Sequence, residues 1–343
     1  MPASLASIRR SGPARRASLL RNEGKLVTMK QSSNETMLML NYINQFLEYC
    51  ELDKNLSPST LKMYRYYLET FNQWLVKNAG DLTPDKLSPE IIRSYRLYLS
   101  RYVNPIKGPL KRTTQLYFLI AIRTLLHFFA LRGIKSMPAD QIELGKGRDR
   151  TIKFLDEGQL ERLLSSPEIA TEEGLRDKAI LETLFSTGLR VAELVKLNRD
   201  QINIDRREFG VIGKGGKARV VYLSEIAASW LSRYLKARDD PFRPLFIHYS
   251  GKIDNQNHGE KMRLTARSVE RIVEKYGLKI RLPFRIGPHS LRHSFATDLL
   301  MHGADIRSVQ EMLGHKNIGT TQIYTHVTNK QLRDVHEAFH GRK

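Results

Sequence analysis

Chemistry-bearing residues gather near the carboxyl end of the chain, between residues 288 and 324. The motifs Pro-His-Ser-Leu-Arg-His, Leu-Gly-His and Thr-Gln-Ile-Tyr-Thr-His supply His289, Arg292, His315 and Tyr324. A tyrosine can serve as a covalent nucleophile, but its phenol needs activation because its ordinary pKa is about 10. The planar guanidinium of an arginine can donate two parallel hydrogen bonds to the oxygens of one phosphate. The combination indicates a site that holds a phosphodiester while a phenol oxygen attacks it.

Two motifs upstream supply further cations. Gly-Leu-Arg-Val-Ala-Glu-Leu contains Arg190, and Gly188 permits a tight turn from which that arginine can project. Glu193 follows one helical turn later, where its carboxylate can orient the guanidinium. The run Gly-Lys-Gly-Gly-Lys-Ala-Arg, between two apolar stretches, predicts a β-hairpin with Lys214 near its tip. Taken singly, the two motifs are better explained as a surface arginine and a turn lysine.

Metal binding is the alternative use of the histidines. Their spacing does not match a two-histidine helical zinc motif, and acidic residues are few around them. The single cysteine, Cys50, allows neither an internal disulfide nor a cysteine-based metal site, and it fits a reducing compartment. We therefore expect no metal and no cofactor.

The composition favours a polyanionic partner. The chain has 343 residues, enough for about two domains, and a formal net charge of +20. Each lysine or arginine near a phosphate releases counterions, so such an excess is typical of proteins that bind nucleic acid. No run approaches the roughly 20 apolar residues that a bilayer-spanning helix needs, so we expect no membrane partner.

The first 33 residues are expected to form a disordered basic leader, or to include an over-extended start upstream of Met29. An organelle transit peptide is the alternative, because the leader is rich in arginine and serine and poor in acids. Up to residue 28, Glu23 is the only acidic residue. The basic residues of this stretch are Arg9, Arg10, Arg15, Arg16, Arg21 and Lys25.

Four amphipathic helices are predicted between residues 34 and 133 and would form a small bundle. Ser57 and Ser88, each followed by proline, are good starts for the second and third helices, and Gly133 suits the end of the fourth. The polar stretch 134–152 then reads as a linker. The apolar residues at helical spacing in the first helix are Met37, Leu40, Ile43, Phe46 and Leu47.

The second unit, from about residue 153, must position the candidate site. Helices are expected around Leu160, from Leu175 to Thr187, and over residues 264–276, with the hairpin between them. His289 and Arg292 lie one turn apart on another helix and can face one point. Further helices are expected over residues 306–313 and 320–327. The fold class is therefore mainly α with a small antiparallel β-sheet.

Taken in order, these motifs resemble the tyrosine recombinase (phage integrase) family, most closely its Xer-type site-specific recombinases. The resemblance covers about residues 34–343. It implies a two-domain, C-shaped DNA clamp with an N-terminal SAM-like, core-binding bundle over 34–133. It also implies a catalytic domain over 153–329, and a C-terminal helix over 330–343 that docks onto a neighbouring protomer. The stretch from Pro241 to Pro288 departs most from the family pattern, and its unusually polar part, Tyr249 to Lys261, reads as a loop extension.

The resemblance also implies roles for single residues. Tyr324 would form a 3′-phosphotyrosyl link to DNA and free a 5′-hydroxyl. Arg190 and Arg292 would hold the scissile phosphate, and His315 would donate a hydrogen bond to one of its non-bridging oxygens. Lys214, with Lys217 as its substitute, would protonate the leaving 5′ oxygen. His289 would do base work and contact the phosphate, and Glu193 would support the first arginine.

The implied function is strand exchange through a Holliday junction at a double-stranded recombination site. It would serve either chromosome dimer resolution, hence chromosome partition at cell division, or mobile-element integration and excision. The implied assembly is a homo-tetramer, or a hetero-tetramer with a paralogous recombinase, activated by a DNA translocase and located with the nucleoid in the cytoplasm. Alternatives are a type IB topoisomerase, a telomere resolvase and a non-catalytic DNA-binding protein. The sequence does not name the DNA target, because phosphate contacts carry no base information.

Overall fold

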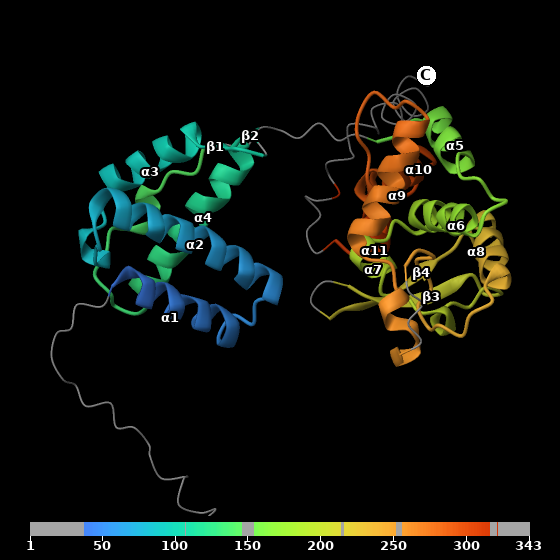
Figure 1. The fold of residues 1–343 in the computed structure, drawn as a ribbon, viewed down its shortest axis with the longest axis horizontal. Helices are drawn as coiled ribbons and strands as arrows, with labels where there is room; N and C mark the ends of the chain where they lie inside the picture. Colours follow the sequence, from blue (N-terminus) through green and yellow to red (C-terminus); the bar gives the residue numbers. More distant parts are fainter. Residues whose placement is uncertain are drawn as a thin grey trace, which may run out of the picture. The chain divides into compact units, whose positions relative to one another are not determined.

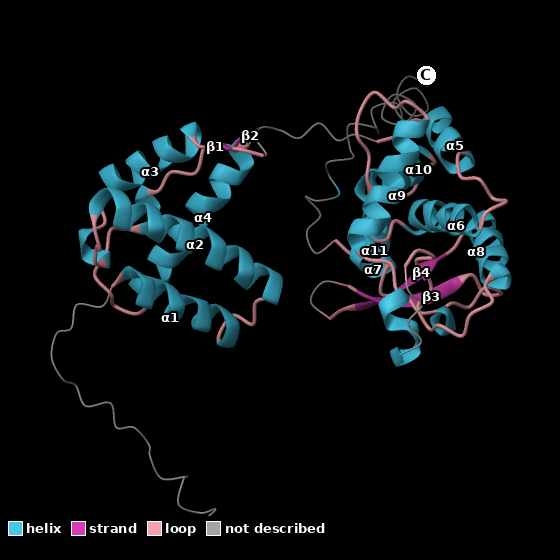
Figure 2. Ribbon diagram, in the orientation of Figure 1, coloured by secondary structure: helices cyan, strands magenta, loops and turns pink. Residues whose placement is uncertain are grey.

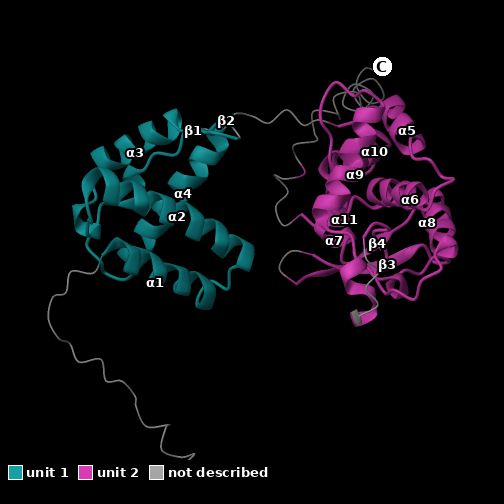
Figure 3. Ribbon diagram, in the orientation of Figure 1, with its two compact units in different colours: residues 1–149 teal, residues 150–343 magenta. Residues whose placement is uncertain are grey.

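The computed structural model describes residues 38–106, 108–145, 154–213, 216–251, 256–315 and 321. The chain divides into two compact units, residues 1–149 and 150–343, each with its own apolar core (Figures 1 and 3). In the described residues helices predominate, and the strands form two short antiparallel pairs (Figure 2). The predicted fold class, mainly α with a small antiparallel sheet, is confirmed.

Unit 1 is helical, with one minimal strand pair before its last long helix. Its main elements are α1 (Met39–Leu52), α2 (Pro58–Ala79), α3 (Pro89–Arg101), β1 (Val103–Asn104), β2 (Gly108–Pro109) and α4 (Arg112–Leu131). Short 3-10 turns, η2 (Pro84–Lys86) and η3 (Ala139–Gln141), complete it.

The starts of α2 and α3 agree with the sequence prediction. The Ser57 hydroxyl accepts a hydrogen bond from the backbone N–H of Thr60, and the Ser88 hydroxyl accepts one from Ile91. A proline follows each serine, at a position where a missing N–H costs nothing because it has no partner in the helix. These caps satisfy donors that the first helical turn leaves unpaired.

Aromatic side chains fill the core of unit 1. Phe46 of α1 and Tyr95 of α3 meet rings of α4 edge-on or at a tilt, with centroids 5.6 Å apart for Phe46 and Phe128. Cys50 is 2% exposed in this core, and burial raises the pKa of its thiol to about 11. Leu40, expected on the apolar stripe of α1, is instead exposed, because the buried stripe of that helix is centred on Ile43 and Phe46.

Helix α4 is, among the described helices, the one long and apolar enough to span a bilayer by length and composition alone. Eight of its residues are buried, including Phe118, Ile122 and Leu125. Its apolarity is thus accounted for by its place in the core of unit 1.

Unit 2 contains the short hairpin and most of the candidate site. Its elements are α5 (Glu157–Ser165), α6 (Glu172–Thr187), α7 (Val191–Leu194), β3 (Glu208–Ile212), β4 (Ala218–Tyr222), α8 (Glu225–Ala237), α9 (Ala266–Lys279), α10 (Pro288–Met301) and α11 (Ile306–Leu313). Two 3-10 segments, η4 (Arg199–Gln201) and η5 (Gln256–Met262), lie in its loops. Helix α8, capped by Ser224, was not among the expected helices.

Helix α6 is the central element of unit 2 and packs against α5, α8, α9 and α10. Four of its charged side chains, Arg176, Asp177, Lys178 and Glu182, are buried, and each of them is paired. Arg176 donates two hydrogen bonds to Asp177, whose carboxylate also accepts one from Tyr276. Lys178 forms an ion pair with Glu182 at 2.7 Å. Such pairing is required because an unpaired buried charge is costly.

Strands β3 and β4 form the hairpin that the sequence predicts. Phe209 pairs with Val221, and Val211 pairs with Arg219, on the face that points into unit 2. The Gly213 N–H donates to the Lys217 carbonyl at 2.8 Å and closes the described end of the ladder. The tip itself, with Lys214, lies outside the described residues.

The loop between α8 and α9 is less uniformly polar than its sequence indicates. Phe242, Ile247 and Met262 form a small buried apolar cluster, and Tyr249 packs against it. Residues 252–255 of the expected loop extension lie outside the described part of the chain.

Gly188 should be irreplaceable at the end of α6. Its φ is +59°, and an added Cβ would lie 2.4 Å from a ring carbon of Phe295. Gly188→Ala should therefore lower the free energy of unfolding by about 2–4 kcal/mol, from the left-handed backbone and the overpacking together. Urea unfolding of the whole chain measures the loss.

Gly210→Ala is the matched control, because no atom lies within 4 Å of the Cβ it would add. This variant should unfold at nearly the parent urea concentration. Equal stability of the two variants would contradict the close approach at Gly188.

Candidate active site

Arg190 lies at the junction of α6 and α7. The left-handed turn at Gly188 ends α6, and Arg190 is the residue that precedes the first turn of α7. Glu193, in α7, accepts hydrogen bonds from the Arg190 backbone N–H at 2.9 Å and from its Nη1 at 3.1 Å. The carboxylate therefore fixes both the chain direction and the guanidinium, as the spacing of the motif predicts.

Arg292 is buried on α10 and is only 4% exposed. Its Nη1 donates to the Gly188 carbonyl at 2.5 Å, and its Nη2 donates to the Leu313 carbonyl at 2.6 Å. Hydrogen bonds from a charged donor contribute about 1.5–3 kcal/mol each, so these two hold the guanidinium firmly. The turn before Arg190 is thereby tied to the second arginine.

The two guanidiniums meet at the carboxyl end of α11. Arg292 binds the carbonyl of Leu313, and Arg190 Nη2 donates to the next carbonyl, that of Gly314, at 3.3 Å. Gly314 ends the helix in the left-handed conformation, with φ of +63°. The last carbonyls of a helix lack helical partners and carry partial negative charge, so they suit cationic donors. This end of α11 gathers both arginines at one place.

His315 follows directly and lies between Arg292 and Thr321. Its Nε2 is 2.9 Å from Arg292 Nη2, and its Nδ1 is 3.0 Å from the Thr321 hydroxyl. A guanidinium only donates, so Nε2 must accept and the ring proton belongs on Nδ1. Burial, followed by the charges of Arg292 and Arg190, lowers the pKa of His315 to about 4.

His289 occupies the first turn of α10, next to Pro288. Its side chain reaches solvent, unlike that of Arg292. Partial desolvation, followed by the positive charges of Arg292 and Arg190, lowers its pKa. A neutral imidazole is able to accept a proton, which base work requires.

The structure thus brings together four of the six predicted site residues: Arg190, His289, Arg292 and His315. Lys214 and Tyr324 lie outside the described residues, and so does the expected helix 320–327 apart from Thr321. Both strands of the hairpin and Gly213, the residue directly before Lys214, are among the described residues.

Arg219 and Thr321 are contacts that the sequence analysis did not assign. Arg219 donates to both oxygens of Glu193, at 3.1 and 2.9 Å. Its signal was present, because strand alternation places it on the same face as buried Val221, where a cation needs a partner. Thr321 had no such signal, since its contact with His315 depends on the fold.

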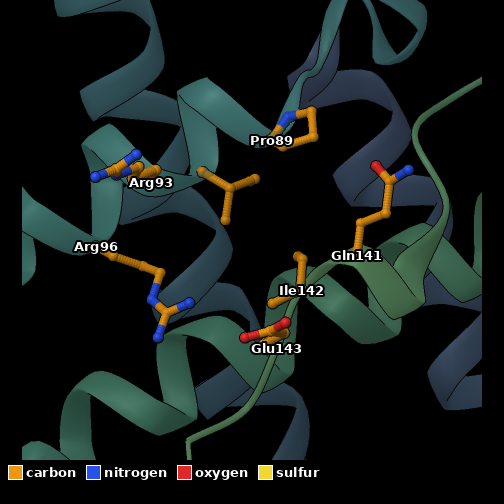
Figure 4. Close-up of a pocket in the computed structure, with 7 residues that line it drawn as sticks. Pro89, Arg93, Arg96, Gln141, Ile142 and Glu143 are labelled. Atoms are coloured by element: carbon orange, nitrogen blue, oxygen red, sulfur yellow. The ribbon is translucent and has the colours of Figure 1, made fainter.

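A hollow of about 340 Å³ lies in unit 1, lined in part by Arg93 and Arg96 of α3 and by residues 141–143 (Figure 4). It contains none of the candidate site residues. No group of three or more metal-ligating side chains occurs in the part of the chain that the structure describes.

Both units match known families. The family model described as "Phage integrase family" matches residues 153–331, and "Phage integrase, N-terminal SAM-like domain" matches residues 43–133. The first of these matches includes all six predicted site residues.

Curated relatives span nearly the whole chain. It is 37% identical over 306 residues to the tyrosine recombinase XerD of Listeria innocua, covering 89% of this chain and 100% of the relative. It is 36% identical to the tyrosine recombinase XerC of Pelotomaculum thermopropionicum, covering 88% and 98%.

Solved structures share the fold. The Tn1549 transposon integrase in complex with transposon right-end DNA has a TM-score of 0.69 at 17% identity, covering 89% of this chain and 100% of that one. The XerH recombinase bound to palindromic difH has a TM-score of 0.61 at 23% identity, covering 90% and 92%. With the family model over more than half of the 343 residues and relatives above 35% identity, the chain belongs to the phage integrase family of tyrosine recombinases.

Proposed function

We propose that this protein is an Xer-type site-specific recombinase that cuts and rejoins DNA through a 3′-phosphotyrosyl intermediate and a Holliday junction. One observation carries the proposal: Arg190 and Arg292 meet beside His315 at the end of α11. Three cationic or hydrogen-bonding side chains from separate elements converge there, which suits a tetrahedral anion.

The arginines would stabilise the phosphate as it becomes five-coordinate. Charge then builds on the non-bridging oxygens, and preorganised donors stabilise it without reorganising. Two protein carbonyls hold the Arg292 guanidinium, so its position is fixed by the protein itself.

The reaction needs one nucleophile and one acid. The Tyr324 phenol oxygen attacks phosphorus, and His289 takes its proton or orients it. The bond to the 5′ oxygen breaks, and that oxygen receives a proton from Lys214. The phosphotyrosine conserves the energy of the broken ester, so a second 5′-hydroxyl can reverse the step without ATP and join a new strand.

To donate from Nε2 to the phosphate, His315 needs a proton on that nitrogen. Its Nε2 accepts from Arg292 in the DNA-free state, with the proton on Nδ1. A phosphate anion beside the ring favours the imidazolium, which can donate from both nitrogens. We therefore infer that DNA binding raises the pKa of His315 from its low free value and takes up a proton.

The proposed organisation follows the resemblance. Residues 34–133 would be the core-binding domain, 134–152 the linker and 153–329 the catalytic domain, with 1–33 as a basic leader. Four copies, or two copies with two of a paralogue, would assemble on two DNA sites. An activating translocase, a role in chromosome partition and a place with the nucleoid belong to the same proposal.

Tyr324→Phe should abolish covalent capture of DNA. The substrate is a nicked duplex carrying a site selected from a randomised pool for tight binding, so that the cleaved strand is lost by diffusion. The parent should accumulate a protein–DNA adduct on a denaturing gel, whereas the variant should bind the duplex and form none.

An adduct with the phenylalanine variant would overturn the assignment of the nucleophile. Absence of an adduct with the parent would favour the non-catalytic DNA-binding alternative. A topoisomerase would relax plasmids without exchanging strands between two selected sites, so the two assays run together separate that rival.

DNA affinity should depend on pH through His315. The pKa of about 4 in the free chain rises when phosphate binds, so affinity should increase as pH falls from 8 to 6. His315→Gln should flatten this slope, as fluorescence anisotropy at constant ionic strength can measure.

His302→Gln is the control, since this histidine is exposed at the end of α10. It should keep the parent slope. Equal slopes for the parent and His315→Gln would contradict proton uptake at His315.

Deleting residues 330–343 should weaken pairing of two DNA sites more than binding of one. This segment lies outside the described residues; in its sequence Leu332, Val335 and Phe339 recur at helical spacing, and we propose that it docks onto a neighbouring copy. Gel shifts with one and with two labelled sites measure both steps. Unchanged recombination by the truncated protein would count against docking.

A further inference from the structure

Arg219 occupies an unusual place for a cation. It lies on β4 opposite Val211, on the face of the hairpin that points into unit 2, and its side chain is only 12% exposed. Its Nε donates to the Met312 carbonyl at 3.2 Å, near the end of α11. Its two terminal nitrogens bind the two oxygens of Glu193. One side chain thus joins β4, α7 and α11.

Glu193 is shared between two arginines. It accepts two hydrogen bonds from Arg219 and two from Arg190, one of these from the backbone N–H. Burial favours its protonated form, but these bonds outweigh burial and hold its pKa below the usual range. The carboxylate of Glu193 therefore stays ionised, and the positive charge of Arg219 partly neutralises it.

This sharing determines how Arg190 is held. Glu193 is 7% exposed, whereas the Arg190 side chain is 30% exposed and faces the candidate phosphate site. Without Arg219, the full charge of a buried carboxylate would act on Arg190 alone and draw its guanidinium inward. With Arg219 in place, the Arg190 guanidinium makes one hydrogen bond to the carboxylate and one to the Gly314 carbonyl, and its other donors are left for a ligand.

Arg219 also touches the root of the lysine-bearing hairpin. A Cβ added at Gly213 would lie 3.3 Å from Arg219 Nη1, and one added at Gly314 would lie 3.2 Å from the same atom. The guanidinium is therefore fitted between two glycine backbones. Gly213 directly precedes Lys214 and is hydrogen-bonded to Lys217 across the hairpin.

We propose that Arg219 is a positioning residue that couples the Lys214 hairpin to the phosphate-holding Arg190, by binding Glu193 while packing against Gly213. The inference rests on the proposed function, since it concerns the same reaction. It assigns Arg219 no contact with DNA. Its loss should displace two groups at once, the arginine that stabilises the phosphate and the lysine that protonates the leaving oxygen.

The test uses the full chain and two versions of the nicked substrate. One has the ordinary ester, and the other has sulfur in place of the bridging 5′ oxygen. A thiolate leaves without a proton, so the second substrate does not need the acid on the hairpin. Arg219→Gln should slow cleavage of the ordinary ester about 100-fold, the loss expected of a displacement near 1 Å. On the sulfur substrate the deficit should shrink to about tenfold, the part due to Arg190.

Three further variants test whether Arg219 acts through Glu193. Arg219→Lys, which can make only one contact with Glu193, should show the same pattern in milder form, and it replaces Arg219→Gln if that variant does not fold. Glu193→Gln combined with Arg219→Gln should be little slower than either alone, because both disrupt one unit. Arg206→Gln, an exposed change on the loop before β3, is the matched control and should cleave like the parent.

The outcomes separate cleanly. Parent-like cleavage by both Arg219 variants would overturn the proposal, and an equal deficit on the two substrates would overturn the coupling to the hairpin. A lowered urea midpoint and weaker DNA binding would identify Arg219→Gln as misfolded, and the two-substrate comparison with Arg219→Lys then decides the proposal. If the parent itself forms no adduct, the proposed function fails, and that result is independent of Arg219.

Discussion

The candidate site depends on backbone carbonyls at the end of α11 that have no partner within the helix. A helix leaves its last carbonyls without partners, and here Leu313 and Gly314 offer theirs to Arg292 and Arg190. The arginines come from α10 and from the start of α7, far apart in sequence. The end of one helix thus holds two arginines from separate elements close together. His315 comes directly after Gly314, where the left-handed backbone ends α11.

The same interactions make the site largely self-satisfied before substrate binds. Arg292 is buried and bonded to backbone on two sides, and His315 accepts from it. Under the proposed function, this preorganisation would lower the cost of binding a transition state, since little would have to be ordered at that moment. Nε2 of His315 accepts from Arg292, so contact of that nitrogen with a phosphate would require a proton there.

Local rules account for the parts of the fold that could be predicted. Ser57 and Ser88 start their helices through side-chain caps. Gly188 and Gly216 have positive φ angles, which other residues rarely adopt, and so mark turns in the sequence. Helix α8 was not predicted, although Ser224 caps its start as Ser57 caps that of α2. Leu40 was misplaced because helical periodicity alone does not define the centre of a buried stripe.

The site was predictable in composition but not in connectivity. Residue types and motif order identify Arg190, His289, Arg292 and His315, whereas their backbone partners depend on how α10 and α11 meet. Arg219 is the clearest example. Its position on the inward face of β4 predicts that it needs a partner, but the sequence does not identify that partner as Glu193. The contact of Thr321 with His315 is of the same kind.

The lone thiol has a practical consequence. Cys50 is the chain's single cysteine, it is buried among the rings of unit 1, and its raised pKa keeps it protonated at neutral pH. Thiol-directed dyes and spin labels react with the thiolate, so they should pass it by. A cysteine introduced on the surface of either unit would then be the sole labelled position, and a dye placed there could be followed by fluorescence without first removing a native residue.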